Sequence, residues 1–92
     1  MPITATQTFK HSSRVAWRKV KDEAVILDVE TAAYYSLRGT GLRIWELIGG
    51  RKSLEQVVER IAAEYDAPEA VVRRDCRELV ERLRREKMIE PA

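Results

Sequence analysis

Side chains able to perform acid–base, nucleophilic or metal chemistry are few and scattered in this sequence. His11 is its single histidine and Cys76 its single cysteine, whereas a metal site or a catalytic pair needs several such groups together. Cys76 follows helical apolar spacing, where a buried thiol behaves as a small hydrophobe. Gly39-Thr40-Gly41 lacks the spacing of a nucleotide-binding loop. The sequence therefore predicts a protein that is not an enzyme, with no catalytic residue, metal or cofactor.

Arginines gather where a third helix is expected to begin, at Arg73, Arg74 and Arg77. Such a cluster is typical of DNA-reading helices in winged helix-turn-helix proteins. Seven basic and five acidic residues lie between Glu69 and Lys87, and the whole chain carries only +2. Most of these arginines have acidic neighbours four positions away, which favours a solvated helix face. Nucleic acid is therefore not the expected partner, and a winged-helix DNA-binding regulator is kept as the alternative function.

Adjacent tyrosines, Tyr34 and Tyr35, mark the third of three short β-type runs. Side chains alternate across a strand, so one tyrosine should face the core and the other should not. An open strand edge with exposed aromatic residues normally needs a partner. Either both tyrosines complete the core, or the edge is used for binding.

The three runs span residues 15–20, 24–29 and 33–37, and short, mostly polar segments separate them. This pattern predicts an antiparallel meander. The middle run is almost continuously apolar and fits the central strand, which makes the third strand an edge.

Helical spacing begins after Gly39 and Gly41. Residues 42–48 are apolar on most sides, and Ser53 with Gln56 forms a capping box for a second helix. Asp66 is expected to cap a third helix that reaches about Lys87. The buried stripe expected on the third helix is Val72, Cys76, Leu79, Val80 and Leu83. Met88 and Ile89 should then pack back onto the core.

The predicted fold class is α+β and winged helix-turn-helix-like: a three-stranded antiparallel β-meander followed by three α-helices. Residues 1–13 lack periodicity and are expected to be a loosely ordered N-terminal lead-in, and residues 14–90 form one domain. Without a membrane-length apolar run or a secretion signal, we expect a cytoplasmic protein with no membrane contact.

Four segments together resemble the coenzyme-PQQ synthesis protein D family, the stand-alone recognition element for ribosomally made, modified peptides. The most specific are Tyr34-Tyr35-Ser36-Leu37 and Gly41-Leu42-Arg43-Ile44-Trp45-Glu46-Leu47-Ile48. The others are Ile26-Leu27-Asp28-Val29 and Ser53-Leu54-Glu55-Gln56-Val57-Val58. Stand-alone members of this family also occur in lasso-peptide pathways, which the sequence resembles at least as closely.

The resemblance implies a peptide chaperone. A precursor's leader segment would add as a strand to the third β-strand, beside the third helix, and be delivered to a maturation enzyme such as a leader peptidase or radical enzyme. The family's groove, carried onto matching positions, comprises Tyr34, Tyr35, Ser36 and Leu37 on the strand with Val71, Val72, Asp75, Cys76 and Leu79 on the helix.

Overall fold

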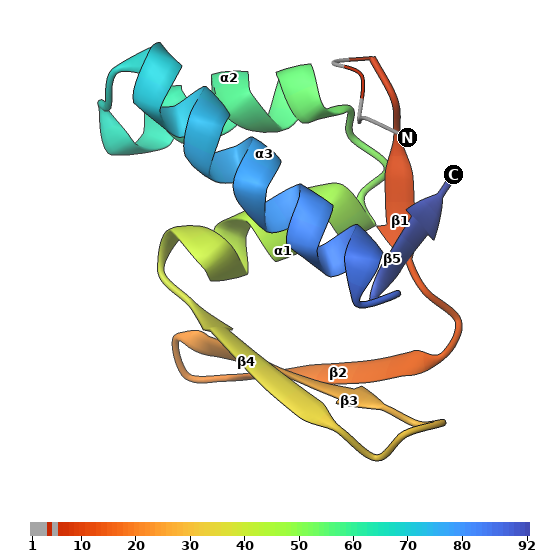
Figure 1. Cartoon of the computed structure of the whole chain (residues 1–92). Coiled ribbons are helices and arrows are strands. Elements are labelled where there is room, and N and C mark those ends of the chain that lie inside the picture. The colour runs from red at the N-terminus through yellow and green to blue at the C-terminus, as the bar shows by residue number, and fades with distance from the viewer. Residues whose placement is uncertain (1–3, 5) are drawn as a thin grey trace.

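The computed structural model describes residue 4 and residues 6–92. The order of elements is β1 (Phe9–His11), β2 (Val15–Val20), β3 (Glu23–Asp28), β4 (Tyr34–Arg38), α1 (Thr40–Gly49), α2 (Leu54–Tyr65), α3 (Glu69–Arg85) and β5 (Ile89–Pro91). The α+β class, with a three-stranded antiparallel meander and three helices, is confirmed. In Figure 1 the meander lies below the helices, with α1 between the sheet and the other two helices.

The meander has the order β2-β3-β4, so the most apolar strand is central as predicted. Ala24 and Ile26 of β3 are fully buried beneath the helices. Val25 pairs with Ser36, and Ile26 with Tyr35. This register sets Tyr35 on the same face as the buried Ile26, because directly opposite residues share a face of the sheet.

Asp28 organises the connection between β3 and β4. Its carboxylate accepts hydrogen bonds from the N–H groups of Glu30 and Thr31 at 2.9 and 3.3 Å, and from Arg14. Burial alone would raise the pKa of Asp28, but these hydrogen bonds and the Arg14 charge outweigh it and lower the pKa. The carboxylate is therefore a buried charge with partners, which holds the start of β4 in place.

The helices supply most of the core. Trp45 and Ile48 of α1 are fully buried, and α3 contributes an apolar stripe that packs on α2. Four of the five predicted stripe residues of α3 are buried, and Leu79 is partly buried: Val72, Cys76, Val80 and Leu83 form the buried set. Ser53 and Gln56 form the predicted capping box of α2.

The role predicted for Asp66 is wrong. Asp66 ends α2 in a left-handed conformation, with φ 49°, and Pro68 stands at the start of α3 without a side-chain cap. Asp tolerates this backbone region better than most residues, so a tight turn between two packed helices can use it as a C-cap.

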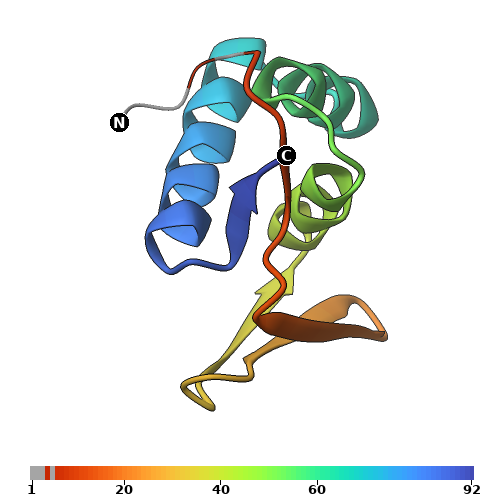
Figure 2. The ribbon, with the colours of Figure 1, turned by 90° about the vertical axis from the view of Figure 1, so that its right-hand side faces the viewer.

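The expected loose lead-in is also contradicted where the structure describes it. β1 pairs with β5 in a second, two-stranded antiparallel sheet that the sequence pattern did not predict, and Phe9 is fully buried. Figure 2 shows β5 lying between α3 and the N-terminal segment. A lone aromatic residue at 9 gives no strand periodicity, so only the partner strand at the other end of the chain reveals its role. Residues 1–3 and 5, also included in that expectation, lie outside the described residues.

His11, the last residue of β1, packs against α1. Its ring stacks on Trp45 with centroids 3.8 Å apart, and its Nε2 lies 2.8 Å from the Trp45 carbonyl oxygen. A Cβ at position 49 would collide with the His11 ring, so glycine is required there. His11 is therefore a packing residue that ties β1 to the helices.

Candidate functional site

Strand β4 presents an open edge. It pairs with β3 on one side, and among the described residues no strand pairs with its other side. Tyr34 is 71% exposed, and Ser36 is exposed on the same outer face. Tyr35 and Leu37 face the helices and are partly buried. Of the two tyrosines, Tyr35 is thus the one that faces the core.

α3 lies along the inner side of this edge. Three observations, taken from one end of β4 to the other, establish the direction of the helix relative to the strand. Near one end of β4, the Tyr35 hydroxyl donates a hydrogen bond to the Glu86 carboxylate just after α3, at 3.2 Å. Farther along, a Cβ built on Gly41 would stand 3.6 Å from Leu37 Cδ2 and 3.8 Å from Leu79 Cδ2.

At the opposite end, Thr40 lines a pocket with residues from the beginning of α3. Positions rise along α3 as they fall along β4, so the helix and the edge strand run antiparallel. We call this arrangement the β4–α3 seam, comprising Tyr35, Leu37, Gly41, Leu79 and Glu86. Its middle is apolar, and its hydrogen-bonding side is the unpaired edge of β4.

The pocket at the Thr40 end of the seam, beside the start of α3, has a volume of about 110 Å³. Tyr65 and Val71, which line it, are 48% and 43% exposed, so apolar surface faces the solvent at this pocket. Four predicted site residues line it together: Val71, Val72, Asp75 and Cys76. It is a small apolar recess bordered by one carboxylate.

Asp75 and Cys76 have different environments within this pocket. The Asp75 side chain is 56% exposed and lies 3.5 Å from the Arg74 guanidinium. Cys76 has no exposed surface, and burial, followed by the charge of Asp75, raises the pKa of its thiol to about 11. At neutral pH the thiol is protonated and shielded, so Cys76 is an apolar lining residue and a poor nucleophile.

The structure therefore brings the predicted residues together in part. Leu37 and Leu79 both approach Gly41 in the seam, four α3 residues share the pocket, and Tyr34 and Ser36 lie on the outer face of the sheet. Sequence reasoning missed Thr40, Tyr65 and Glu86. Tyr65 follows the apolar spacing of α2, which is typical of a core residue, and Glu86 gave no signal because its role depends on where α3 ends relative to β4.

The arginines near the start of α3 are engaged with other protein groups. Arg73 makes hydrogen bonds to Glu55 at 2.6 and 3.1 Å and to Glu69 at 2.6 Å, and these carboxylates raise its pKa. Arg74 contacts Asp75, and Arg77 also has an interaction partner. Arginines held in this way are not free to contact phosphates and bases.

Two further features bear on chemistry. In the described part of the chain, His, Cys, Asp and Glu side chains form no cluster that could hold a metal ion. Among the same residues, no helix has both the length and the hydropathy needed to cross a bilayer.

Comparison with protein-family models decides the family. The model for Coenzyme PQQ synthesis protein D (PqqD) matches residues 23–89, from β3 to the first residue of β5. The chain belongs to the PqqD family. The resemblance inferred from sequence is thereby confirmed, and the PqqD match includes the whole β4–α3 seam.

Solved structures similar to this PqqD-family chain include two peptide complexes. One is described as TbiB1 in complex with the TbiA(beta) leader peptide; it is 34% identical, has a TM-score of 0.83, and the match covers 88% of this chain and 94% of that one. The other, a lasso peptide synthetase B1 complexed with the leader peptide, is 23% identical with a TM-score of 0.82, covering 90% and 98%. The second likeness supports the fold alone. No curated protein matches the chain.

Proposed function

We propose that this chain binds the leader segment of a ribosomally synthesised precursor peptide and delivers it to a maturation enzyme. The leader adds as a strand to the open edge of β4 and lies over the β4–α3 seam. The observation that carries this proposal is the antiparallel alignment of an unpaired strand edge with an apolar helix face, at Leu37 and Leu79. Family membership and the 34% identity to TbiB1, whose structure contains a leader peptide, support the same function.

Strand addition accounts for both affinity and selectivity. Main-chain N–H and C=O groups of β4 supply the ladder, and alternate peptide side chains point toward or away from the seam. Inward side chains would contact Leu37 and Leu79, and a longer apolar side chain would enter the pocket beside Val71 and Val72. The predicted site residues thus have two roles. Those on β4 bind the main chain of the peptide, and those on α3 select its side chains.

A second edge, β2, is a poorer site for strand addition. Arg18 and Lys19 in this strand and Lys21 just beyond it place positive charge along the edge, a common way to discourage unwanted pairing. Lys19 is also tied to Glu46 at 3.5 Å. We therefore assign the peptide to β4.

The receiving enzyme is the less detailed part of the proposal. Family membership favours a peptide-modifying or leader-removing enzyme, such as a leader peptidase or radical enzyme. The protein itself is proposed to act by binding, which membership of the PqqD family favours. The alternative DNA-binding function is not supported, since Arg73 is fully engaged by Glu55 and Glu69.

Titration with a leader peptide tests the proposal. The TbiA(beta) leader is a ready probe, and we expect a dissociation constant of micromolar or better, about −8 kcal/mol. Amide NMR signals of Tyr34–Leu37 should shift most, and those of Val15–Val20 least, because the new ladder forms on β4. A response confined to Val15–Val20 would assign the peptide to β2. Tight, sequence-specific duplex DNA binding at physiological salt without leader binding would refute the function.

A further inference from the structure

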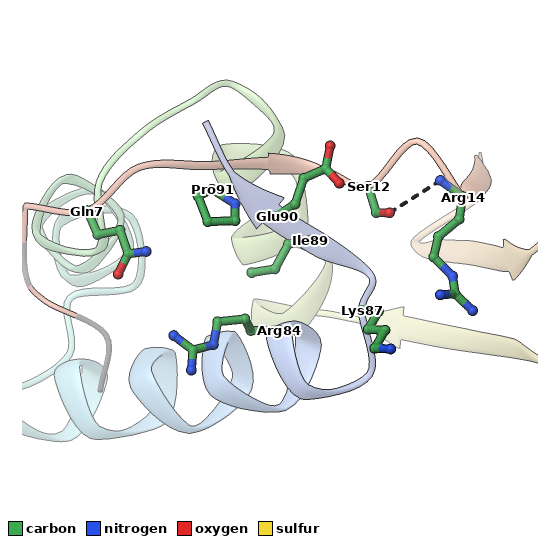
Figure 3. A pocket seen from close by; sticks show the side chains of 8 residues that line it. All are labelled: Gln7, Ser12, Arg14, Arg84, Lys87, Ile89, Glu90 and Pro91. Carbon is green, nitrogen blue, oxygen red and sulfur yellow. Dashed lines mark hydrogen bonds between the residues drawn. The ribbon is translucent and has the colours of Figure 1, made fainter. Parts of the chain in front are cut away.

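A larger cavity lies beyond the Glu86 end of the seam, between the C-terminal part of α3, strand β5 and the segment around β1. Its volume is about 690 Å³. Figure 3 shows Arg84 and Lys87 on its α3 side, with Ile89 and Pro91 on the strand that faces them. The cavity is large enough for several side chains of a bound peptide.

Positive charge dominates its lining. Arg84, Lys87 and Arg14 contribute cations, and the one acidic lining residue, Glu90, is ion-paired with Lys10 at 3.7 Å. Arg14 is occupied by Asp28 and Glu30. Arg84 and Lys87 have no ion-pair partner among the residues that the structure describes. The cavity therefore offers two unmatched cations to a ligand.

Two connections place lining residues of the cavity close to the Glu86 end of the seam. Lys87 follows Glu86, whose carboxylate accepts the hydrogen bond from Tyr35. On the opposite side, Arg14 is bound to Asp28, whose N–H donates to the carbonyl of Ala33, the residue before β4. A peptide that extends past the Tyr34 end of β4 would therefore leave the seam on the side of the molecule that carries Lys87.

Strand addition cannot simply continue into the cavity. β5 forms one wall of the cavity. Its residue Pro91 has no N–H group to donate to an added peptide strand there. Contacts at this wall must come from side chains. Two unpaired cations beside a partly buried apolar surface favour carboxylates.

We infer that this cavity binds acidic residues of the same precursor peptide, immediately adjoining the segment that adds to β4. The inference rests on the proposed function and extends it to a charge preference. The leader is then held by two unlike contacts: a main-chain ladder at β4, and an electrostatic contact at Arg84 and Lys87. The contact at Arg84 and Lys87 determines which terminus of the peptide points toward β5.

Extended probes test this inference. The TbiA(beta) leader is prepared unextended and with four Asp or four Asn residues at either terminus, and affinity is measured by fluorescence anisotropy. At one terminus only, the Asp extension should bind about fivefold to tenfold more tightly than the Asn extension at low ionic strength. Raising salt from about 20 to about 300 mM should remove most of this gain.

Charge-reversal variants locate the effect. The double variant Arg84→Glu/Lys87→Glu should lose the gain from Asp, so that it binds the Asp-extended leader no more tightly than the Asn-extended leader. Arg85→Glu, an exposed change on the same helix outside the cavity, should keep the gain. Equal affinity of the Asp and Asn probes, or a gain that survives in the double variant, would overturn the inference.

Failure of the proposed function gives a different result. If the unextended leader does not bind, a short aspartate peptide is titrated alone. Amide shifts at Ser12, Lys87 and Ile89 would retain the cavity as a carboxylate site without a leader. No shift at these residues would exclude the site itself.

Discussion

Leu37 of β4 and Leu79 of α3 approach the same point above Gly41, 3.6 and 3.8 Å from where a Cβ on that glycine would stand. The edge strand and the helix thus each place a partly buried leucine beside Gly41, at the middle of the seam. In the proposed complex these side chains form the apolar floor beneath the bound peptide.

Leu79→Ala should weaken leader binding about fivefold to tenfold, roughly 1 kcal/mol, because it removes apolar contact surface from this floor. Calorimetry with the leader peptide measures the effect. Leu79→Met, which nearly conserves volume, is the matched control and should bind almost normally. Unchanged affinity in Leu79→Ala would mean that the peptide does not contact this leucine.

Asp75→Arg should weaken leader binding while leaving the fold intact. The carboxylate borders the pocket and is 56% exposed, so it can accept a charge-assisted hydrogen bond from the peptide. Reversing its charge should cost about 1–3 kcal/mol of binding.

Glu81→Arg provides the control for Asp75→Arg. It makes the same charge change on α3, about 120° around the helix from Asp75. Calorimetry and thermal melts on both variants separate a local contact from a general charge effect. Unchanged affinity in Asp75→Arg would remove Asp75 from the site, and a large fall in melting temperature would assign it to the fold.

Phe9→Ala should destabilise the protein by about 3–5 kcal/mol, because Phe9 is a fully buried aromatic side chain. Lys10→Ala on the same strand should cost under about 1 kcal/mol, since the Lys10–Glu90 pair is exposed and 3.7 Å apart. Urea unfolding of both variants measures the difference. Similar stabilities would mean that β1 adds little to the core.

Stability should fall as the pH drops below about 6.5, the ordinary pKa of histidine. Burial lowers the pKa of His11, although the hydrogen bond to Trp45 opposes the shift. The unfolded chain therefore takes up a proton before the folded one does, which favours unfolding between the two pKa values, and stability is constant above them.

Unfolding free energies measured from about pH 5 to 8 report this group, because His11 is the only histidine in the chain. His11→Phe keeps an aromatic ring against Trp45 and should flatten the profile. Stability that is unchanged or increases toward pH 5 in the unmodified protein would contradict the assignment.

Local patterns were enough to predict the meander, the central position of β3 and the capping box at Ser53, because each depends on neighbouring residues. They failed where distant segments decide the structure. Phe9 becomes a core residue only because β5 pairs with β1, and Asp66 ends a helix because of how two helices pack. In the candidate site, alternation showed that one tyrosine must face inward, but only the register with β3, which sets Tyr35 opposite the buried Ile26, identifies it as Tyr35. The role of Glu86 and the cavity at Arg84 depend on where α3 ends relative to the strands.

The pairing of Phe9 with Pro91 has a consequence for how the chain folds during synthesis. The meander and the helix pairs form from contacts between segments close in sequence, and such contacts form early. β1, although made first, has no partner strand until β5 has left the ribosome, and Phe9 lacks part of its cover until then. β5 must therefore be synthesised before the nascent domain can fully bury Phe9, so a chain that stops before β5 would expose Phe9 to chaperones and proteases.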